Sequence, residues 1–300
     1  MKDKNLDFLK KQYLHTPIPE ELDSVVKKAL KDGSEHRMKR NKLIKRTSVA
    51  AVLIVVFAGV LTVGINSSPA FASALEKVPI VGGIVKVLTF KEYTVNEDRF
   101  KADIKVPAIV GLENKELQNS LNEKYLAENK KLYEEFMAEM ENMKKEEGGY
   151  LGVDSGYVVK TDTDRILSIG RYVLTVAGSS STVFKYDTVD KKEGILITLP
   201  SLFKDNSYIE IISENIKDQM RERMKADDGF IYWVDVDENE EFIEPFDKIS
   251  PNQNFYITEE GKLVISFDKY EVGPGYMGIQ EFEIPTEVIA DILVSNEYIR

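Results

Sequence analysis

Cysteine is absent from the 300-residue chain, and histidine occurs only twice, at His15 and His36. Without cysteine there is no disulfide, no thiolate nucleophile, no cysteine-ligated zinc or iron–sulfur centre and no lipoprotein acylation site. Both histidines precede a long apolar run, so the larger part of the chain after it lacks a Ser-His-Asp triad, a histidine-ligated metal and a histidine general base. We therefore expect no cofactor, no metal and no catalytic residues.

Charged residues are absent from the apolar run 49–65. Seventeen residues in a helix cover ~26 Å, which crosses a hydrocarbon core of ~30 Å if the flanks contribute. Residues 37–46, just before the run, carry six basic and no acidic side chains: Arg37, Lys39, Arg40, Lys42, Lys45 and Arg46. Because basic flanks stay in the cytoplasm, the sequence predicts a single-pass protein of the cell membrane with a cytoplasmic N-terminus and an extracellular C-terminal domain.

The outer flank of this run ends in Ala72-Ser73-Ala74, a small-x-small pattern typical of signal-peptidase sites. A removable secretory signal has a short charged n-region and an apolar stretch of ~7–15 residues. Here 48 residues precede a longer apolar run. Two interpretations stay open: a plain signal anchor with an alanine-rich flank, and an anchor with a regulated cleavage site between Ala74 and Leu75.

Two short helices are predicted before the apolar run. The apolar side chains of the first, Leu9 and Tyr13 among them, are spaced helically. After prolines at 17 and 19 comes a second stripe: Leu22, Val25, Val26, Ala29 and Leu30. Isolated helices of this length are marginal in water. They are either a loose juxtamembrane hairpin or, as we favour, a segment that binds a cytoplasmic protein through these apolar faces.

These patterns divide the chain into four regions: cytoplasmic helices at 1–46, a transmembrane helix at 48–66, a juxtamembrane segment at 67–90 and an extracellular domain at 91–300. Charge divides with them, because residues 1–46 carry 13 Lys+Arg and 7 Asp+Glu, a net of +6, which leaves a net of −17 for the rest. An acidic outer domain attracts cationic partners. The simpler alternative, that the acidity keeps an exported protein soluble, stays open.

The outer region predicts an α+β fold, an antiparallel sheet with packed helices. Alternation from Phe100 to Val106 predicts a strand, and apolar residues every three or four positions after Asn114 predict a long helix that ends at Gly148-Gly149. A second helix is predicted from Ser207, with Ser207 and Glu210 as a capping box. Thr286 is expected to cap a last short helix.

Other parts of the outer region indicate turns. Residues 256–267 predict a hairpin, residues 178–181 (Gly-Ser-Ser-Ser) a break between strands, and residues 273–276 (Gly-Pro-Gly-Tyr) an exposed turn. The acidic run 235–241 lacks the central glycine and the spacing of an EF-hand, so we expect a solvated loop there and no calcium site.

Several stretches, in order along nearly the whole chain, carry a family resemblance: residues 18–23, 79–86, 198–205, 263–272 and 273–278. In these stretches the chain resembles the anti-sigma-V (RsiV) family of membrane anti-sigma factors of Gram-positive bacteria. The resemblance implies that residues 1–46 hold an extracytoplasmic-function sigma factor and that the outer α/β domain binds lysozyme. Neither role involves direct contact with nucleic acid.

The resemblance also implies a signalling sequence. Lysozyme binding exposes the signal-peptidase site at Ala72, Ala74 and Leu75, a site-2 protease then cuts within the anchor, and the sigma factor is released. The lysozyme-binding loops of the family map to Pro274, Gly275 and Tyr276 and to a serine-rich loop near Ser179, Ser180 and Ser181. From the residues alone, a rigid Gly-Pro-Gly turn that presents an aromatic side chain is typical of an interface anchor.

Three alternatives belong to other classes of protein. A membrane-anchored lysozyme inhibitor without signalling would not need the inner helices. A wall-modifying deacetylase would need metal-binding histidines, which residues 47–300 lack. A non-catalytic cell-wall-binding module is the third.

Overall fold

The computed structural model describes residues 85–146, 148–236 and 244–300. These residues belong to one compact unit, which extends from residue 66 to residue 300. None of the helices described is both long enough and apolar enough to cross a membrane. The predicted transmembrane helix lies outside the described residues.

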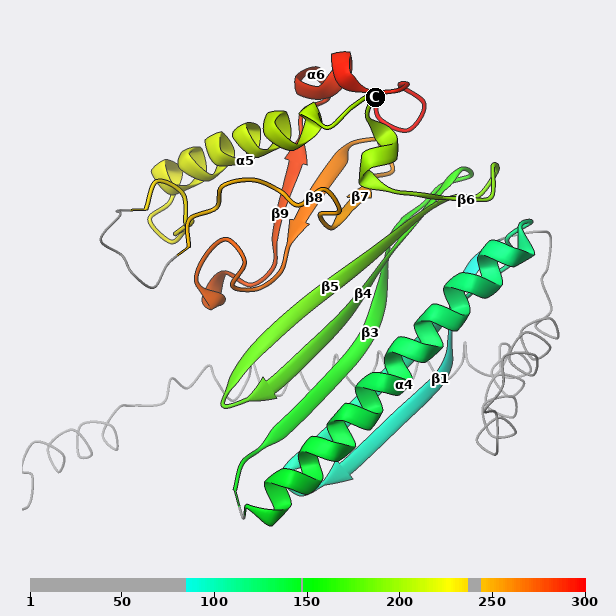
Figure 1. Ribbon diagram of the computed structural model, residues 1–300, viewed down its shortest axis with the longest axis vertical. Coiled ribbons are helices and arrows are strands. Elements are labelled where there is room, and N and C mark those ends of the chain that lie inside the picture. The colour runs from blue at the N-terminus through cyan, green and yellow to red at the C-terminus, as the bar shows by residue number, and fades with distance from the viewer. Residues whose placement is uncertain (1–84, 147, 237–243) are drawn as a thin grey trace, which may run out of the picture. The chain divides into compact units, whose positions relative to one another are not determined.

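The first half of the unit is a six-stranded sheet covered on one face by a long helix (Figure 1). The strands lie in the order of the chain. They are β1 Lys86–Glu97, β2 Phe100–Val110, β3 Leu151–Asp162, β4 Ile166–Ala177, β5 Ser179–Asp190 and β6 Ile195–Ile197. Strand β1 thus begins inside the range expected to be juxtamembrane.

The expectation of a purely antiparallel sheet is wrong in one respect, because β2 and β3 pair in parallel. The cause is helix α4, Lys115–Lys145, which connects them. A helix of this length returns the chain to the end of the sheet where β2 began, so the next strand runs in the same direction. The other strand pairs are antiparallel, and the sheet is mixed.

Helix α4 begins and packs as its sequence predicts. Asn114 is the N-cap, and its side-chain oxygen accepts a hydrogen bond from the Leu117 amide at 3.0 Å. The helix ends at Lys145, just before the predicted Gly148-Gly149. Its apolar stripe, including Tyr125 and Phe136, lies against the alternate residues of β2 and β3 that point to the same face.

The second half of the unit is a three-stranded antiparallel sheet with helix α5, Ser207–Ala226, on one face (Figure 1). Its strands are β7 Phe255–Ile257, β8 Leu263–Phe267 and β9 Gln280–Ile284, and β7 and β8 form the predicted hairpin. Ile212, Ile216 and Met220 of α5 are fully buried against this sheet.

Two predicted helix starts are corrected. Ser207 is the first residue of α5 and makes no capping box with Glu210; instead its amide donates to Asp205 Oδ1 at 2.9 Å. The capping box lies one element earlier, between Thr198 and Ser201 of the 3-10 helix η1, Leu199–Leu202. Thr286 is likewise not a cap but the first residue of α6, Thr286–Ile289, and its hydroxyl donates to the Arg300 carbonyl. A 3-10 helix, η3 Ala290–Ile292, completes that segment.

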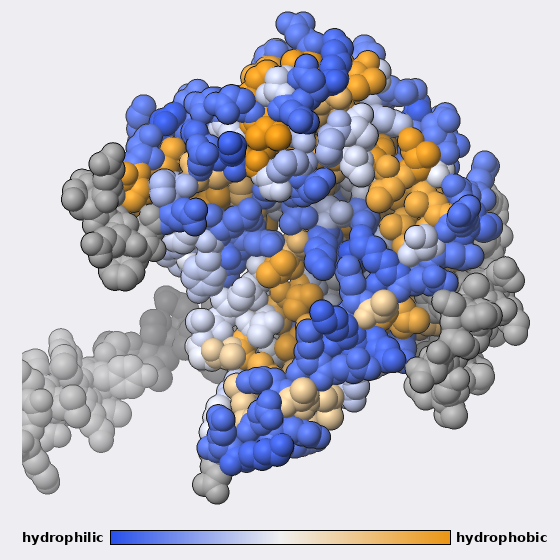
Figure 2. All heavy atoms as spheres, viewed as in Figure 1, coloured by the Kyte–Doolittle hydropathy of each residue, from blue (hydrophilic) through white to orange (hydrophobic). Residues whose placement is uncertain are grey.

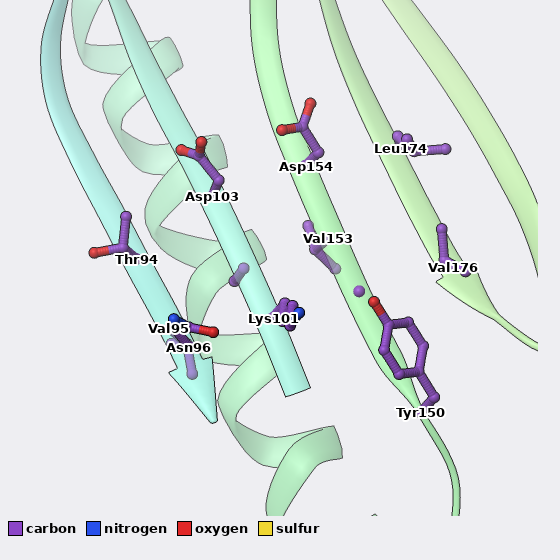
Figure 3. A pocket seen from close by; sticks show the side chains of 12 residues that line it. Thr94, Val95, Asn96, Lys101, Asp103, Tyr150, Val153, Asp154, Leu174 and Val176 are labelled. Carbon is purple, nitrogen blue, oxygen red and sulfur yellow. The ribbon is translucent and has the colours of Figure 1, made fainter. Parts of the chain in front are cut away.

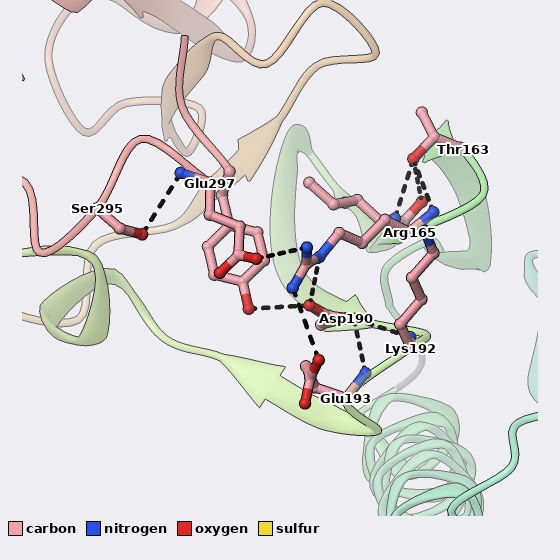
Figure 4. Close-up of polar contacts among 9 residues, drawn as sticks. Thr163, Arg165, Asp190, Lys192, Glu193, Ser295 and Glu297 are labelled. Carbon is pink, nitrogen blue, oxygen red and sulfur yellow. Dashed lines mark hydrogen bonds and ion pairs between the residues drawn. The ribbon is translucent and has the colours of Figure 1, made fainter.

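A polar junction links the two halves (Figure 4). Arg165, in the turn between β3 and β4, donates to Asp190 at 2.8 Å and to Glu297 at 2.6 Å. Tyr298 donates to the same Asp190 oxygen at 2.9 Å. Further along the strands, Lys160 of β3 pairs with Glu281 of β9 at 2.6 Å. The two sheets are therefore held together by side chains as well as by the shared apolar core.

Candidate partner-binding site

The turn expected to be exposed is built around a short 3-10 helix, η2 Gly275–Met277. Pro274 precedes it in an extended conformation and its carbonyl accepts from the Met277 amide at 3.0 Å. Gly278 ends it with φ of 67°, a conformation that glycine adopts without strain. Proline before the turn and glycine after it fix the backbone, so the turn is preorganised.

Tyr276 presents its ring to solvent from the centre of this turn. The residue is 67% exposed, and its hydroxyl donates to the Gly229 carbonyl at 3.0 Å. The hydroxyl contact limits the side chain to one orientation although the ring stays accessible. A tyrosine held in this way offers a large contact area with little rotamer entropy left to lose on binding.

The segment 229–231 forms a wall behind the turn. A Cβ atom on Gly273 would lie 2.7 Å from the Ile231 carbonyl oxygen, so only glycine permits this approach. The Ile231 amide in turn contacts the Met277 sulfur at 3.4 Å. Phe230 and Ile231 are themselves 37% and 50% exposed. The surface around Tyr276 is thus apolar over a wider area than the turn alone.

The serine residues expected in a loop belong to a strand, which corrects that expectation. Ser179, Ser180 and Ser181 are the first three residues of β5 and pair with residues 175–177 of β4. The chain reverses at Gly178, whose φ is +78°, so one glycine replaces the loop. Because side chains alternate along a strand, Ser180 points to one face of the sheet and its two neighbours to the other.

The structure brings Ser180 and the Pro-Gly-Tyr turn together through two residues that sequence reasoning missed. Lys269 Nζ donates to Ser180 Oγ at 2.7 Å. The adjacent Tyr270 lies so close to Gly275 that a Cβ atom there would be 2.2 Å from its ring. Both residues stand in the stretch 263–272 that carries the family resemblance, yet nothing in their spacing indicated a contact with the turn.

Two acidic residues lie close in sequence to these segments. Burial raises the pKa of Asp268, and the negative charge of Glu271 adds to that effect, while a hydrogen bond from the Phe184 amide opposes it. Hydrogen bonds from the Arg221 guanidinium lower the pKa of Asp235, four residues beyond Ile231 in the chain. Asp235 therefore stays ionised under physiological conditions, paired with Arg221.

A hollow of about 530 Å³ lies elsewhere in the described unit, on the face of the six-stranded sheet opposite α4. Asp103 and Asp154 line it beside Tyr150 and Leu174 (Figure 3). Hydrogen bonding with Asp103 raises the pKa of the neighbouring Glu92. No group of three or more potential metal ligands occurs among the described residues. The visible surface is mostly hydrophilic, with apolar side chains in small separate groups (Figure 2).

The remaining predicted site residues lie outside the described residues. They are the cleavage residues Ala72, Ala74 and Leu75, and the sigma-binding residues Leu9, Tyr13, Leu22, Val25, Val26 and Leu30.

Comparison with known proteins covers these regions as well. The anti-sigma-V factor RsiV of Bacillus subtilis (strain 168) is 47% identical to this chain over 298 residues, which cover 99% of this chain and all of the relative. A family described as "Protein of unknown function (DUF3298)" matches residues 200–287.

Two crystal structures of DUF3298 proteins are more distant. One, from Bacteroides fragilis NCTC 9343, is 17% identical with a TM-score of 0.49 and covers 71% of this chain and 94% of its own. The other, from Pseudomonas aeruginosa PAO1, is 13% identical with a TM-score of 0.46 and covers 72% and 96%. The family follows from the Bacillus relative alone, because its identity is high and extends from end to end: the chain belongs to the anti-sigma-V factor RsiV family.

Proposed function

We propose that this chain senses lysozyme outside the cell and controls a sigma factor inside it. Family membership gives the chain an anti-sigma function, which is regulatory and not enzymatic. In the proposal, residues 1–46 hold an extracytoplasmic-function sigma factor, residues 48–66 cross the membrane, residues 67–90 carry the cleavage site and the domain beyond them binds lysozyme. The observation that carries the proposal is the end-to-end 47% identity, which includes the residues predicted to form the inner helices and the anchor.

The geometry of the outer domain supports a protein ligand over a small molecule. Tyr276 is an exposed, oriented aromatic side chain with apolar neighbours at Phe230 and Ile231, which is the composition of an interface centre. Lysozyme is a basic protein, and residues 47–300 carry a net charge of −17. A net acidic outer region with an exposed apolar centre suits such a partner.

Binding would act on cleavage by shifting a population. The resting chain hides the backbone near Ala74, and the bound chain favours a form in which signal peptidase reaches it. A site-2 protease then cuts within the anchor, where Gly59 and Gly64 weaken the helix. Severing the anchor frees the inner helices together with the sigma factor.

The cleavage step is tested with the full-length chain in membrane vesicles that contain signal peptidase. We expect a new fragment beginning at Leu75 only when lysozyme is added. Ala74→Trp removes the small side chain required at the cleavage site and should abolish the fragment, whereas Ser73→Trp, at the unconstrained middle position of the small-x-small pattern, should not. Equal cleavage with and without lysozyme would contradict the proposal.

The inner function is tested by co-purification of the sigma factor with the full-length chain. Val26→Asp places a charge on the predicted apolar stripe and should release the sigma factor, whereas Lys28→Asp on the opposite face should not. Lysozyme binding without any bound sigma factor would instead indicate the inhibitor.

A further inference from the structure

The four residues that follow β8, Asp268–Glu271, run along the outer edge of β5; we call them the connector. Asp268 Oδ1 accepts from the Phe184 amide at 2.7 Å, and the Lys269 amide donates to the Thr182 carbonyl at 3.3 Å. Lys269 Nζ reaches Ser180 Oγ at 2.7 Å. Three hydrogen bonds therefore bind the connector to the strand that carries the predicted serines.

At its other end the connector supports the Pro-Gly-Tyr turn. The Tyr270 ring fills the space beside Gly275, where a Cβ atom would lie 2.2 Å from it. The Lys269 ammonium lies 5.1 Å from the centre of the same ring, a cation–π contact. Glu271 closes the segment by accepting from the Asp268 amide at 2.6 Å and from Gln253 Nε2 at 2.9 Å.

The backbone of Tyr270 is strained. Its φ is +74°, a conformation that tyrosine adopts rarely and that glycine or asparagine adopts easily. The side chain is also 45% exposed, so it contributes little to the core. The strained backbone directs the ring onto Gly275, and strain of this kind concentrates at functional sites.

We propose that Lys269 and Tyr270 are positioning residues that hold Ser180 and the Pro-Gly-Tyr turn as one preorganised surface for lysozyme. The inference rests on the proposed function, since lysozyme is the partner. A surface already ordered before binding loses less conformational entropy in the complex. The connector therefore links the two predicted contact regions energetically, so that a change in one alters the contribution of the other.

The test is a double-mutant cycle on the full-length chain in detergent micelles, with binding to hen egg-white lysozyme measured by biolayer interferometry. Gly275→Ala should weaken binding at least tenfold, because the added methyl group meets the Tyr270 ring and displaces the turn. Tyr270→Ala should also weaken it about tenfold, through the loss of support for the turn. In the Tyr270→Ala background, Gly275→Ala should weaken lysozyme binding by less than a further threefold, because the ring that clashes with the added methyl group is gone.

Two controls separate positioning from a general loss of fold or of aromatic surface. Tyr270→Phe keeps the ring and should bind like the natural chain. Tyr150→Ala removes a tyrosine of matched exposure, 44%, immediately before β3 and should leave binding unchanged. Melting temperatures of all variants are measured in parallel to detect a loss of fold. The inference is overturned if the double variant loses affinity by the product of the two single-variant losses.

A second cycle tests the other contact and leaves the backbone intact. Lys269→Met removes the hydrogen bond to Ser180 but retains the side-chain stem, and it should weaken binding. Ser180→Ala should matter less in that background than in the natural chain, and full additivity here also contradicts the inference. Tyr276→Ala tests the proposed lysozyme surface separately from the positioning role. If this variant binds lysozyme as well as the natural chain, the proposed surface is wrong. If it binds more weakly but both double-mutant cycles are additive, only the positioning role of Lys269 and Tyr270 is refuted.

Discussion

Asp190 holds the junction between the two sheets with a single carboxylate. The residue is fully buried and accepts hydrogen bonds from Arg165 and Tyr298 and from the amides of Lys192 and Glu193 (Figure 4). Because these donors come from three separate parts of the chain, they fix the end of β5 against the C-terminal segment. A buried charge with this number of partners is costly to disturb.

We predict that Asp190→Ala lowers the free energy of unfolding of the unit 66–300 by about 3 kcal/mol. The substitution leaves the partly buried Tyr298 hydroxyl and two amides without their acceptor. Asp162→Ala is the matched control, since Asp162 forms an ion pair with Lys191 but is 48% exposed, and it should cost less than about 1 kcal/mol. Urea unfolding at pH 7 measures both, and equal losses would contradict the role of burial.

The same residue gives a pH dependence with a defined sign. Burial alone would raise the pKa of Asp190, but the hydrogen bonds from Glu193, Arg165 and Tyr298 outweigh it and lower the pKa below the usual 3.8. A depressed pKa in the folded state adds stability above the unfolded pKa, and this stability is lost as the pH falls through the folded value. We therefore expect the loss of unfolding free energy caused by Asp190→Ala to be smaller when urea unfolding is repeated at pH 3.5. A larger loss at pH 3.5 would contradict this pH dependence.

At the scale of elements, a buried amide joins α4 to the end of β2. Asn122 is fully buried on α4, and its amide group pairs with both backbone groups of Ile109, at 2.7 Å and 2.8 Å, as a neighbouring strand would. Gln118 accepts from the Leu112 amide one turn earlier, at 3.1 Å. These contacts fix the position of α4 along β2. Apolar packing alone would allow the helix to slide along the strand.

We predict that Asn122→Leu destabilises the unit by about 3 kcal/mol, because it leaves the Ile109 amide and carbonyl buried without partners. The loss should exceed any gain from the added apolar surface. Asn119→Ala, on the same helix and only partly buried, should change stability by less than about 0.5 kcal/mol. Thermal unfolding followed by circular dichroism compares the two, and a neutral Asn122→Leu would show that the paired amide is dispensable.

The elements also show what the sequence could predict. Helix α4 and the β7–β8 hairpin are confirmed because helical spacing, capping and strand alternation are local signals. The parallel pairing of β2 with β3 was missed because alternation is the same for either strand direction. The small polar serines at 179–181 predict a loop, whereas the β4–β5 ladder continues up to Gly178. The contact of Tyr270 with Gly275 depends on a strained φ that no sequence pattern revealed.

For the whole molecule, the charge distribution separates two explanations of the acidic outer region. Residues 47–300 carry a net charge of −17. If this charge serves only solubility, the rate of lysozyme association should hardly depend on salt. If it steers a basic ligand toward the outer domain, association is fast at low salt and slows as the charges are screened.

We predict that the association rate constant for hen egg-white lysozyme falls about tenfold between 50 mM and 500 mM NaCl, where the Debye length shortens from roughly 14 Å to about 4 Å. The dissociation rate should change little, because the contacts at Tyr276 are short-ranged. Tyr276→Ala should show the opposite pattern, with faster dissociation and an unchanged salt dependence of association. Stopped-flow mixing of the full-length chain in detergent with lysozyme separates the two rates. An association rate constant that does not change across this range would indicate that the acidic residues serve solubility only. Recognition would then depend on the apolar turn alone.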